Sequence, residues 1–139
     1  MIRHLLHEFD RALADFDRAI EIDPTLAKAY FDRGVTYQHL KKYPEALRDY
    51  TRSLRLDDRN VLAYNNRGAV HLLLGQPDKA IQDWETALEI DPSFASAKLN
   101  RRILYRRIKR PDPGTRKFPA PGRRPTEATP AMEPSSDDE

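Results

Sequence analysis

Few side chains in this sequence have the type and spacing that catalysis or metal binding requires. His4 and His7 are about one helical turn apart and could touch one metal ion, but no third ligand is nearby. Because protein metal sites use three or four ligands, we interpret both as surface or partly packed histidines and expect no metal. His71 stands where equivalent segments carry tyrosine, which indicates a position at the edge of the core.

The motifs that carry common enzyme chemistry are absent from the sequence. It contains no G-x-x-x-x-G-K phosphate loop, no H-E-x-x-H zinc motif and no G-x-S-x-G nucleophile turn. With no cysteine there is also no thiolate nucleophile and no disulfide. We therefore expect neither enzyme activity nor a cofactor.

Composition places the chain among ordinary globular proteins. Its 139 residues, 39% hydrophobic and 33% charged, suit one domain with a modest core. No segment is apolar for long enough to act as a signal peptide or to span a membrane. We expect a cytoplasmic protein without a membrane partner.

A period of 34 residues runs through the chain. The stretch AIEIDPTLAKAY, which begins at Ala19, returns as ALEIDPSFASAK from Ala87, two periods later. Small residues recur as small residues, and aromatic residues recur as aromatic ones, at four sets of positions: Ala12, Ala46 and Ala80; Phe16, Tyr50 and Trp84; Ala19, Ser53 and Ala87; Ile22, Leu56 and Ile90.

Within each period the apolar residues follow the spacing of two helices. Breaker-like segments, KKYPE in one unit and GQPDK in the next, separate the two helices and predict an antiparallel pair. Gly34 and Gly68 lack bulk, so we expect them to lie against Ala46 and Ala80 where the helices cross. An aromatic residue one turn after each alanine would fill the space beside the crossing.

This pattern resembles the tetratricopeptide repeat, in which an aromatic residue, Gly-x-x-Tyr, Ala-x-x-x-aromatic and Pro recur in 34 residues. The resemblance implies an all-α fold, a short right-handed α-solenoid. Its units would be a partial repeat in residues 1–26, two repeats in 27–60 and 61–94, and a capping helix in 95–110. Residues 111–139 hold seven of the eleven prolines, and we expect them to form a disordered tail.

The first unit is incomplete. Met1 falls at the ninth position of a repeat, so the first helix of that unit is expected to begin in its middle. Phe9, Leu13 and Phe16 would then form an apolar face that is only partly covered. Exposed apolar faces recruit partners, and we expect self-association through residues 1–20.

In the family that the chain resembles, the first helix of each pair lines a concave groove that holds a peptide. This implies a protein-interaction scaffold with a protein or peptide partner. Some members clamp a terminal carboxylate with Lys and Arg, but the matching positions here hold Ser96 and Asn100, or Lys28 and Asp32, so no such clamp is expected. The groove residues implied by position are Phe31, Asp32, Val35, Gln38, Asn65, Asn66, Ala69, Leu72, Leu99, Asn100 and Ile103.

A nucleic-acid-binding helical repeat is the alternative function. Basic residues are concentrated in residues 101–124 and could contact phosphates. Only Tyr105 and Phe118 are available there to stack on bases, and a solvated cap with a soluble tail explains the charge equally well. Nucleic acid is therefore the less favoured partner.

Two charged columns follow the same period without matching the family pattern. Arg33, Arg67 and Arg101 recur at 34-residue steps, as do Asp15, Asp49 and Asp83. Pairing each Asp with the Arg 18 residues later leaves no member over. This arrangement predicts three ion pairs between neighbouring repeats: Asp15 with Arg33, Asp49 with Arg67, and Asp83 with Arg101.

Overall fold

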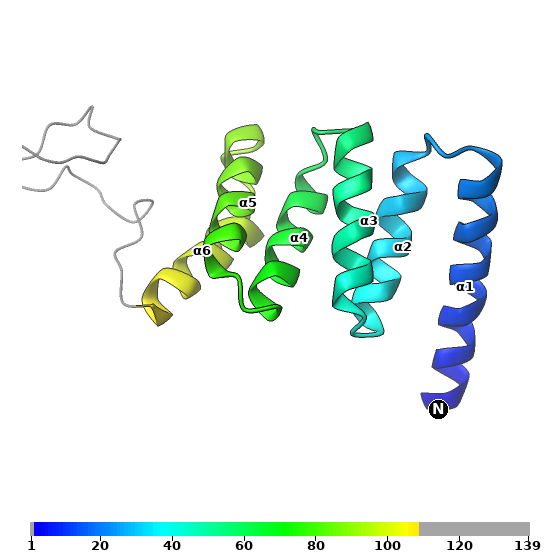
Figure 1. Ribbon diagram of the computed structural model, residues 1–139. Helices are drawn as coiled ribbons and strands as arrows, with labels where there is room; N and C mark the ends of the chain where they lie inside the picture. Colours follow the sequence, from blue (N-terminus) through cyan, green and yellow to red (C-terminus); the bar gives the residue numbers. More distant parts are fainter. Residues whose placement is uncertain (1, 109–139) are drawn as a thin grey trace, which may run out of the picture.

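A computed structural model describes residues 2–108, and over that range the chain forms six α-helices and no strand (Figure 1). The expected all-α repeat fold is confirmed. The helices are α1 (Ile2–Ile22), α2 (Ala27–His39), α3 (Tyr43–Leu56), α4 (Val61–Leu73), α5 (Pro77–Ile90) and α6 (Ala95–Arg107).

The helices are stacked in sequence order, so that each packs mainly against its neighbours in the chain (Figure 1). The pairs α2 with α3 and α4 with α5 form the two most extensive helix contacts. Proline occupies the first turn of α3 and of α5, where its missing N–H costs no hydrogen bond. Each pair is therefore one helical hairpin, and the stack forms a short α-solenoid.

The core is divided into two clusters, one for each hairpin. In the first, Ala46 and Tyr50 are fully buried with Val70. In the second, Ala80 and Ala87 are fully buried and Trp84 is 1% exposed. The aromatic residue that recurs at 34-residue intervals is thus the largest side chain in each cluster.

The two helical glycines lie against aromatic rings, and the expected contact with alanine is wrong. A Cβ atom on Gly34 would come within 2.9 Å of the Tyr50 ring, and one on Gly68 within 2.6 Å of the Trp84 indole nitrogen. The ring needs a flat surface to lie on, and glycine provides it. Ala46 and Ala80 are buried one turn earlier in the same helices.

Replacing Gly68 with alanine should therefore destabilise the fold, although alanine is the better helix former. The added methyl group overlaps a rigid indole whose N–H donates to the Asn65 carbonyl, so the ring cannot move without losing that bond. We expect a loss of about 1 to 3 kcal/mol, as for other overpacked cores. Urea denaturation followed by circular dichroism measures this, and an unchanged or raised midpoint would show that the helices can separate freely.

The first helix does not break where the repeat pattern would place a turn. Lys41 and Gly75, which end the turns after α2 and α4, both have positive φ, 60° and 77°. The residue one period before Lys41 is His7, which lies inside α1. Because residues 7–11 contain neither proline nor glycine, the partial unit forms one 21-residue helix and not the end of one helix followed by another.

Several sequence-based expectations concern residues outside the described range. The disordered tail (111–139) and most of the basic segment (101–124), with Phe118, belong to this group. The capping helix was expected over residues 95–110, and α6 ends at Arg107.

The expected ion-pair ladder is wrong, because each arginine binds the aspartate 16 residues after it and not the one 18 residues before it. Arg33 Nε and Nη2 donate to the two carboxylate oxygens of Asp49 at 2.7 Å. Arg67 binds Asp83 through the same atoms at 2.8 and 2.7 Å. Each pair therefore joins the two helices of one hairpin, while Asp15 is exposed on α1.

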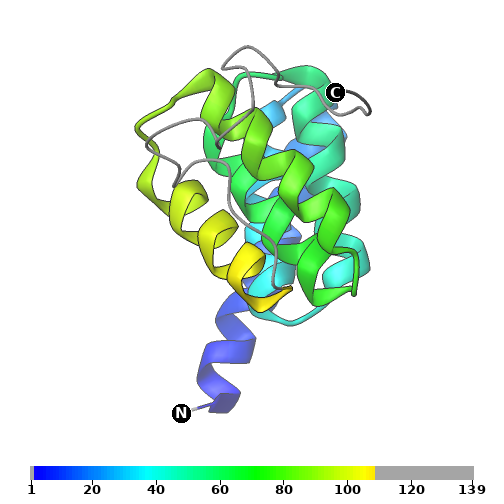
Figure 2. The same cartoon turned by 90° about the vertical axis from the view of Figure 1, so that its left-hand side faces the viewer.

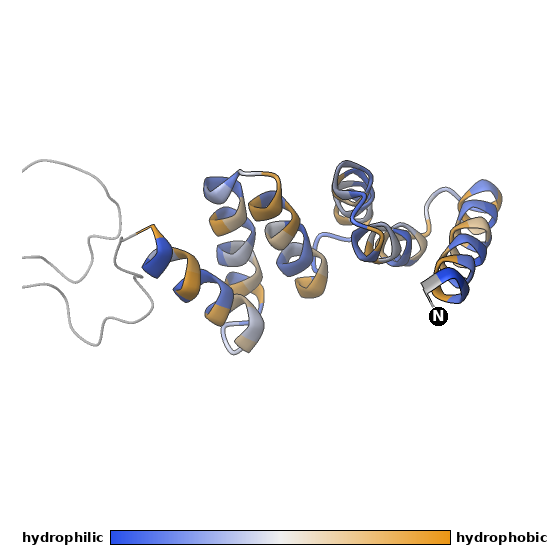
Figure 3. Cartoon of the chain, turned by 90° about the horizontal axis from the view of Figure 1, so that it is seen from below, coloured by the Kyte–Doolittle hydropathy of each residue, from blue (hydrophilic) through white to orange (hydrophobic). Residues whose placement is uncertain are grey.

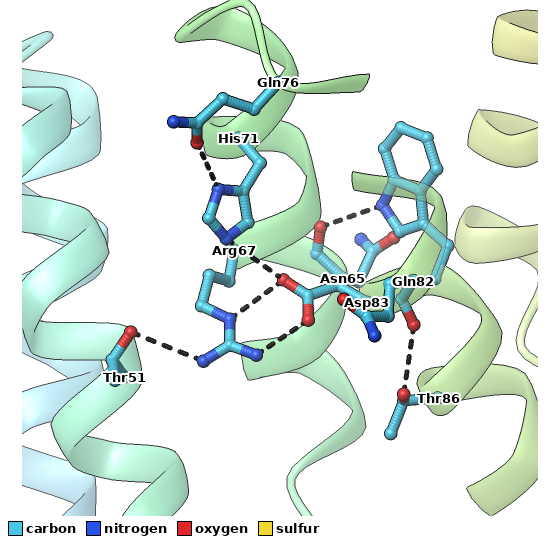
Figure 4. A network of polar contacts seen from close by, with 9 residues as sticks. Thr51, Asn65, Arg67, His71, Gln76, Gln82, Asp83 and Thr86 are labelled. Carbon is cyan, nitrogen blue, oxygen red and sulfur yellow. Dashed lines mark hydrogen bonds and ion pairs between the residues drawn. The ribbon is translucent and has the colours of Figure 1, made fainter. Parts of the chain in front are cut away.

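Each of these arginines still reaches the preceding repeat, through its remaining nitrogen and a different residue. Arg33 Nη1 donates to Asp17 at 2.9 Å, and Arg67 Nη1 donates to Thr51 Oγ1 at 3.3 Å. Figure 4 shows Arg67 between Thr51 and Asp83. Hydrogen bonding to Asp49 raises the pKa of Arg33, and hydrogen bonding to Asp83 raises that of Arg67. Both guanidinium groups consequently stay charged.

Candidate functional site

The concave side of the stack is formed by α2, α4 and α6. Alternate helices on this side contact each other, α2 with α4 and α4 with α6. No such contact joins α1 with α3 or α3 with α5 within residues 2–108. Since the helices that approach one another lie on the inside of a bend, the three helices that carry the predicted groove residues line the inner face (Figure 2).

On α2 the predicted groove residues take part in packing. Phe31 and Val35 pack against the Tyr50 cluster, with the Phe31 and Tyr50 ring centroids 5.9 Å apart. Gln38 Oε1 accepts a hydrogen bond of 2.7 Å from the Tyr50 hydroxyl. Asp32 forms an ion pair with Lys28 at 3.3 Å. This part of the inner face therefore supports the core.

Between α4 and α6 the inner face is hollowed. The hollow has a volume of about 290 Å³, and four of the predicted groove residues, Ala69, Leu72, Asn100 and Ile103, lie in its wall. Ile103 is 43% exposed although it is apolar. The other lining residues, which position matching did not include, are Leu73, Trp84, Leu104 and Arg107.

Two asparagines join the helices that form this hollow. Asn100 Nδ2 donates to Asn65 Oδ1 at 3.1 Å, and the Asn65 carbonyl accepts from the Trp84 indole. Asn100 Oδ1 and Asn65 Nδ2 make no hydrogen bond with another residue of 2–108. One acceptor and one donor are thus left for a ligand, which is the pair that a peptide backbone requires.

The other predicted groove residues lie at the margins of this arrangement. Leu99 is 52% exposed and does not line the hollow. The Asn66 side chain hydrogen-bonds to Tyr50, which lowers the pKa of that phenol, but burial raises it more and the net change is upward. Asn66 therefore helps to hold the neutral Tyr50 hydroxyl in place.

The additional lining residues follow from the end of the array. Leu104 and Arg107 belong to the last helix, which has no second helix of its own within the described residues. A single repeat pattern does not show which residues an end helix leaves accessible. The run of basic residues at 101–107 was the signal in the sequence that a cation would lie at the rim of the hollow.

The histidines do not form a metal site. His4, with a 78% exposed side chain, lies 3.2 Å from Glu8. His71 is buried, with Nδ1 2.7 Å from Gln76 Oε1 and Nε2 3.7 Å from Asp83 (Figure 4). Among residues 2–108 no three His, Asp or Glu side chains are grouped closely enough to hold a metal ion.

The first helix leaves part of its apolar surface uncovered. Leu5 and Leu6 are 54% and 46% exposed, and this end of α1 projects beyond the other helices (Figure 2). Phe9, Leu13 and Phe16 are half-buried, as expected for a face that lacks a preceding helix. Self-association through residues 1–20 stays a prediction.

Two family models match the chain. One, described as a tetratricopeptide repeat, matches residues 27–60 and again 61–94, and a second, described as a TPR repeat, matches residues 2–41. Together they cover well over half of the sequence, so the chain belongs to the tetratricopeptide repeat family. These repeats are protein–protein interaction modules and are typically not enzymes. No curated protein matches by sequence.

Solved structures share this fold. A crystal structure of MamA has a TM-score of 0.70 and 25% identity over 73% of this chain, which spans 59% of that chain. The Arabidopsis OM64 TPR domain has a TM-score of 0.70 and 25% identity, covering 75% and 86% of the two chains. The first TPR of Spaghetti (RPAP3), bound to the HSP90 peptide SRMEEVD, has a TM-score of 0.71 and 24% identity, covering 76% and 84%.

Polar and apolar residues are interspersed along the helices (Figure 3). Over residues 2–108 no helix combines the length and the apolar character that spanning a bilayer requires.

Proposed function

We propose that the chain binds a peptide segment of a partner protein in the hollow between α4 and α6. The observation that carries the proposal is the hollow itself, where four groove residues from two helices meet beside unused amide groups of Asn65 and Asn100. A volume of about 290 Å³ accommodates one or two apolar side chains, and the amides can pair with the backbone between them.

The inner face does not favour a clamp for a terminal carboxylate. Lys28 is paired with Asp32, and the corresponding pair on α6 is Ser96 and Asn100. The RPAP3 repeat shows that a stack of this fold can hold a peptide, but at 24% identity it supports the fold and not the ligand. We infer an internal, largely apolar segment as the ligand.

Peptide selection on the full chain tests this function. Peptides enriched from a random display library should bind at least about tenfold more weakly to Ile103→Asp, because a charge in the hollow has to be desolvated. Ile22→Asp is the matched control, since Ile22 is 76% exposed at the end of α1, far along the stack from the hollow. If both variants bind the peptides as the parent does, the hollow is not the binding site.

A further inference from the structure

A second cavity lies on the other side of α2 and differs in character from the hollow. Its volume is about 600 Å³, and it is lined entirely by residues of α2 and α3. Tyr30 and Arg33 contribute from α2, and at 100° per residue they lie on nearly the opposite face of that helix from Phe31 and Val35. The cavity is therefore separate from the inner face.

The lining of this cavity combines an apolar floor with uncompensated positive charge. Tyr30, Pro44 and Leu47 supply apolar surface, and Arg48, Arg52 and Arg55 stand along one side of α3. These three arginines are exposed and form no ion pair or hydrogen bond with another residue of the described range. We call this cavity the arginine cleft.

Acidic groups inside the cleft do not neutralise these arginines. Both carboxylate oxygens of Asp49 are already bound by Arg33, whose third nitrogen binds Asp17. The Arg52 guanidinium is held over the Tyr30 ring, 5.8 Å from its centroid. Stacking in this way restricts the guanidinium while its N–H groups stay available for a carboxylate.

The repeat pattern does not require this charge. The positions equivalent to Arg48, Arg52 and Arg55 hold Gln82, Thr86 and Glu89 on α5, and Ala14, Arg18 and Glu21 on α1. The basic patch is thus confined to one helix of 14 residues, about 21 Å long. A nucleic acid would extend past it to neutral and acidic surfaces, whereas a short peptide would not.

We propose that the arginine cleft binds an acidic, extended peptide segment of a protein partner, at a site distinct from the hollow between α4 and α6. Arginines four residues apart on a helix are displaced by about 6 Å along its axis. Alternate side chains of an extended peptide are about 6.6 Å apart on one face. A segment with Asp or Glu at every second position can therefore pair with Arg48 and Arg52 while the intervening backbone covers the apolar floor.

Fluorescence anisotropy on the full chain tests the proposal with a labelled twelve-residue probe that alternates Asp or Glu with Leu or Phe. We expect the probe to bind at least about tenfold more tightly than its Asn and Gln counterpart, and Arg52→Glu to remove that advantage. Lys79→Glu, an exposed position on α5 with the same change in charge, should alter binding less than about twofold. Arg48→Glu, which does not touch Tyr30, repeats the test without disturbing the stacked ring.

Several results would overturn the proposal. Equal binding of the neutral peptide would mean that charge does not select the ligand, and equal losses from Arg52→Glu and Lys79→Glu would mean attraction by net charge alone. Tighter binding of a single-stranded RNA, lost in Arg52→Glu, would make the cleft a phosphate site. If the probe binds only after Asp137, Asp138 and Glu139 are neutralised, the occupant is this chain's own acidic segment. Ile103→Asp should leave probe binding unchanged, so this result is independent of the proposed groove function.

Discussion

Replacing Trp84 with alanine should lower the free energy of unfolding by about 3 to 5 kcal/mol, the usual loss when a buried aromatic side chain is deleted. Trp84 is 1% exposed, its indole lies over Gly68, and its N–H donates to the Asn65 carbonyl. Alanine would leave a cavity at the centre of one cluster and an unsatisfied carbonyl beside it. Small domains are stable by only about 5 to 15 kcal/mol, so a large part of the total would be lost.

Urea denaturation followed by circular dichroism at 222 nm measures this loss, because Trp84 is the single tryptophan and fluorescence would disappear with it. Trp84→Phe is the matched control. Phenylalanine stands at the equivalent position 16, fills most of the space and removes only the hydrogen bond, so about 1 to 3 kcal/mol should be lost. If alanine and phenylalanine cost the same, the hydrogen bond and not the packing is the important contribution.

The sequence was sufficient to predict the helices and the packing of their faces. A column occupied by Phe16, Tyr50 and Trp84 is informative because a large ring at a fixed step has to be buried in each unit. The first turn was missed because the period was assumed to extend to residue 7. Only the absence of proline and glycine in residues 7–11, which lets α1 continue, revealed the difference.

The candidate sites were less predictable, since they depend on side-chain direction. Position matching identified residues on the inner helices but did not separate Phe31, which packs into the core, from Ile103, which lines the hollow. The arginine cleft was not predicted, because its charges occur in one repeat and a search for recurring columns excludes them. Sites that depend on a departure from the repeat are found only when the departures are read separately.

The ion pairs show the same limit. Each period contains one Arg and one Asp of the two columns, and a periodic sequence allows the pair to close forwards or backwards. Completeness favoured the backward pairing, in which no residue is left over. The forward pairing forms because Arg33 and Asp49 lie in the two helices of one hairpin, where both carboxylate oxygens can be bound at 2.7 Å. A two-pronged contact of this kind outweighs the count of paired residues.

Asp83→Asn should consequently cost about 3 to 5 kcal/mol, because it leaves the Arg67 guanidinium without its carboxylate in a largely buried site. The Asp83 side chain is 6% exposed and that of Arg67 is 20% exposed, so water can replace the lost partner only in part. His71, 3.7 Å from the same carboxylate, cannot supply a negative charge (Figure 4). Urea denaturation of the single variants, Asp83→Asn and Arg67→Met, gives the two costs.

A double-mutant cycle then separates the pair from its surroundings. Residues in one buried ion pair show coupling of about 0.5 to 3 kcal/mol, while independent sites add within about 0.3 to 0.5 kcal/mol. We expect coupling for Arg67→Met with Asp83→Asn, and additivity for Arg67→Met with Asp49→Asn, because Asp49 is bound by Arg33. The second cycle uses the same arginine variant and the same chemical change at the aspartate, so it is a matched control. Coupling in the second cycle without coupling in the first would mean that the arginines pair backwards along the stack, and the hairpin contacts described above would be wrong.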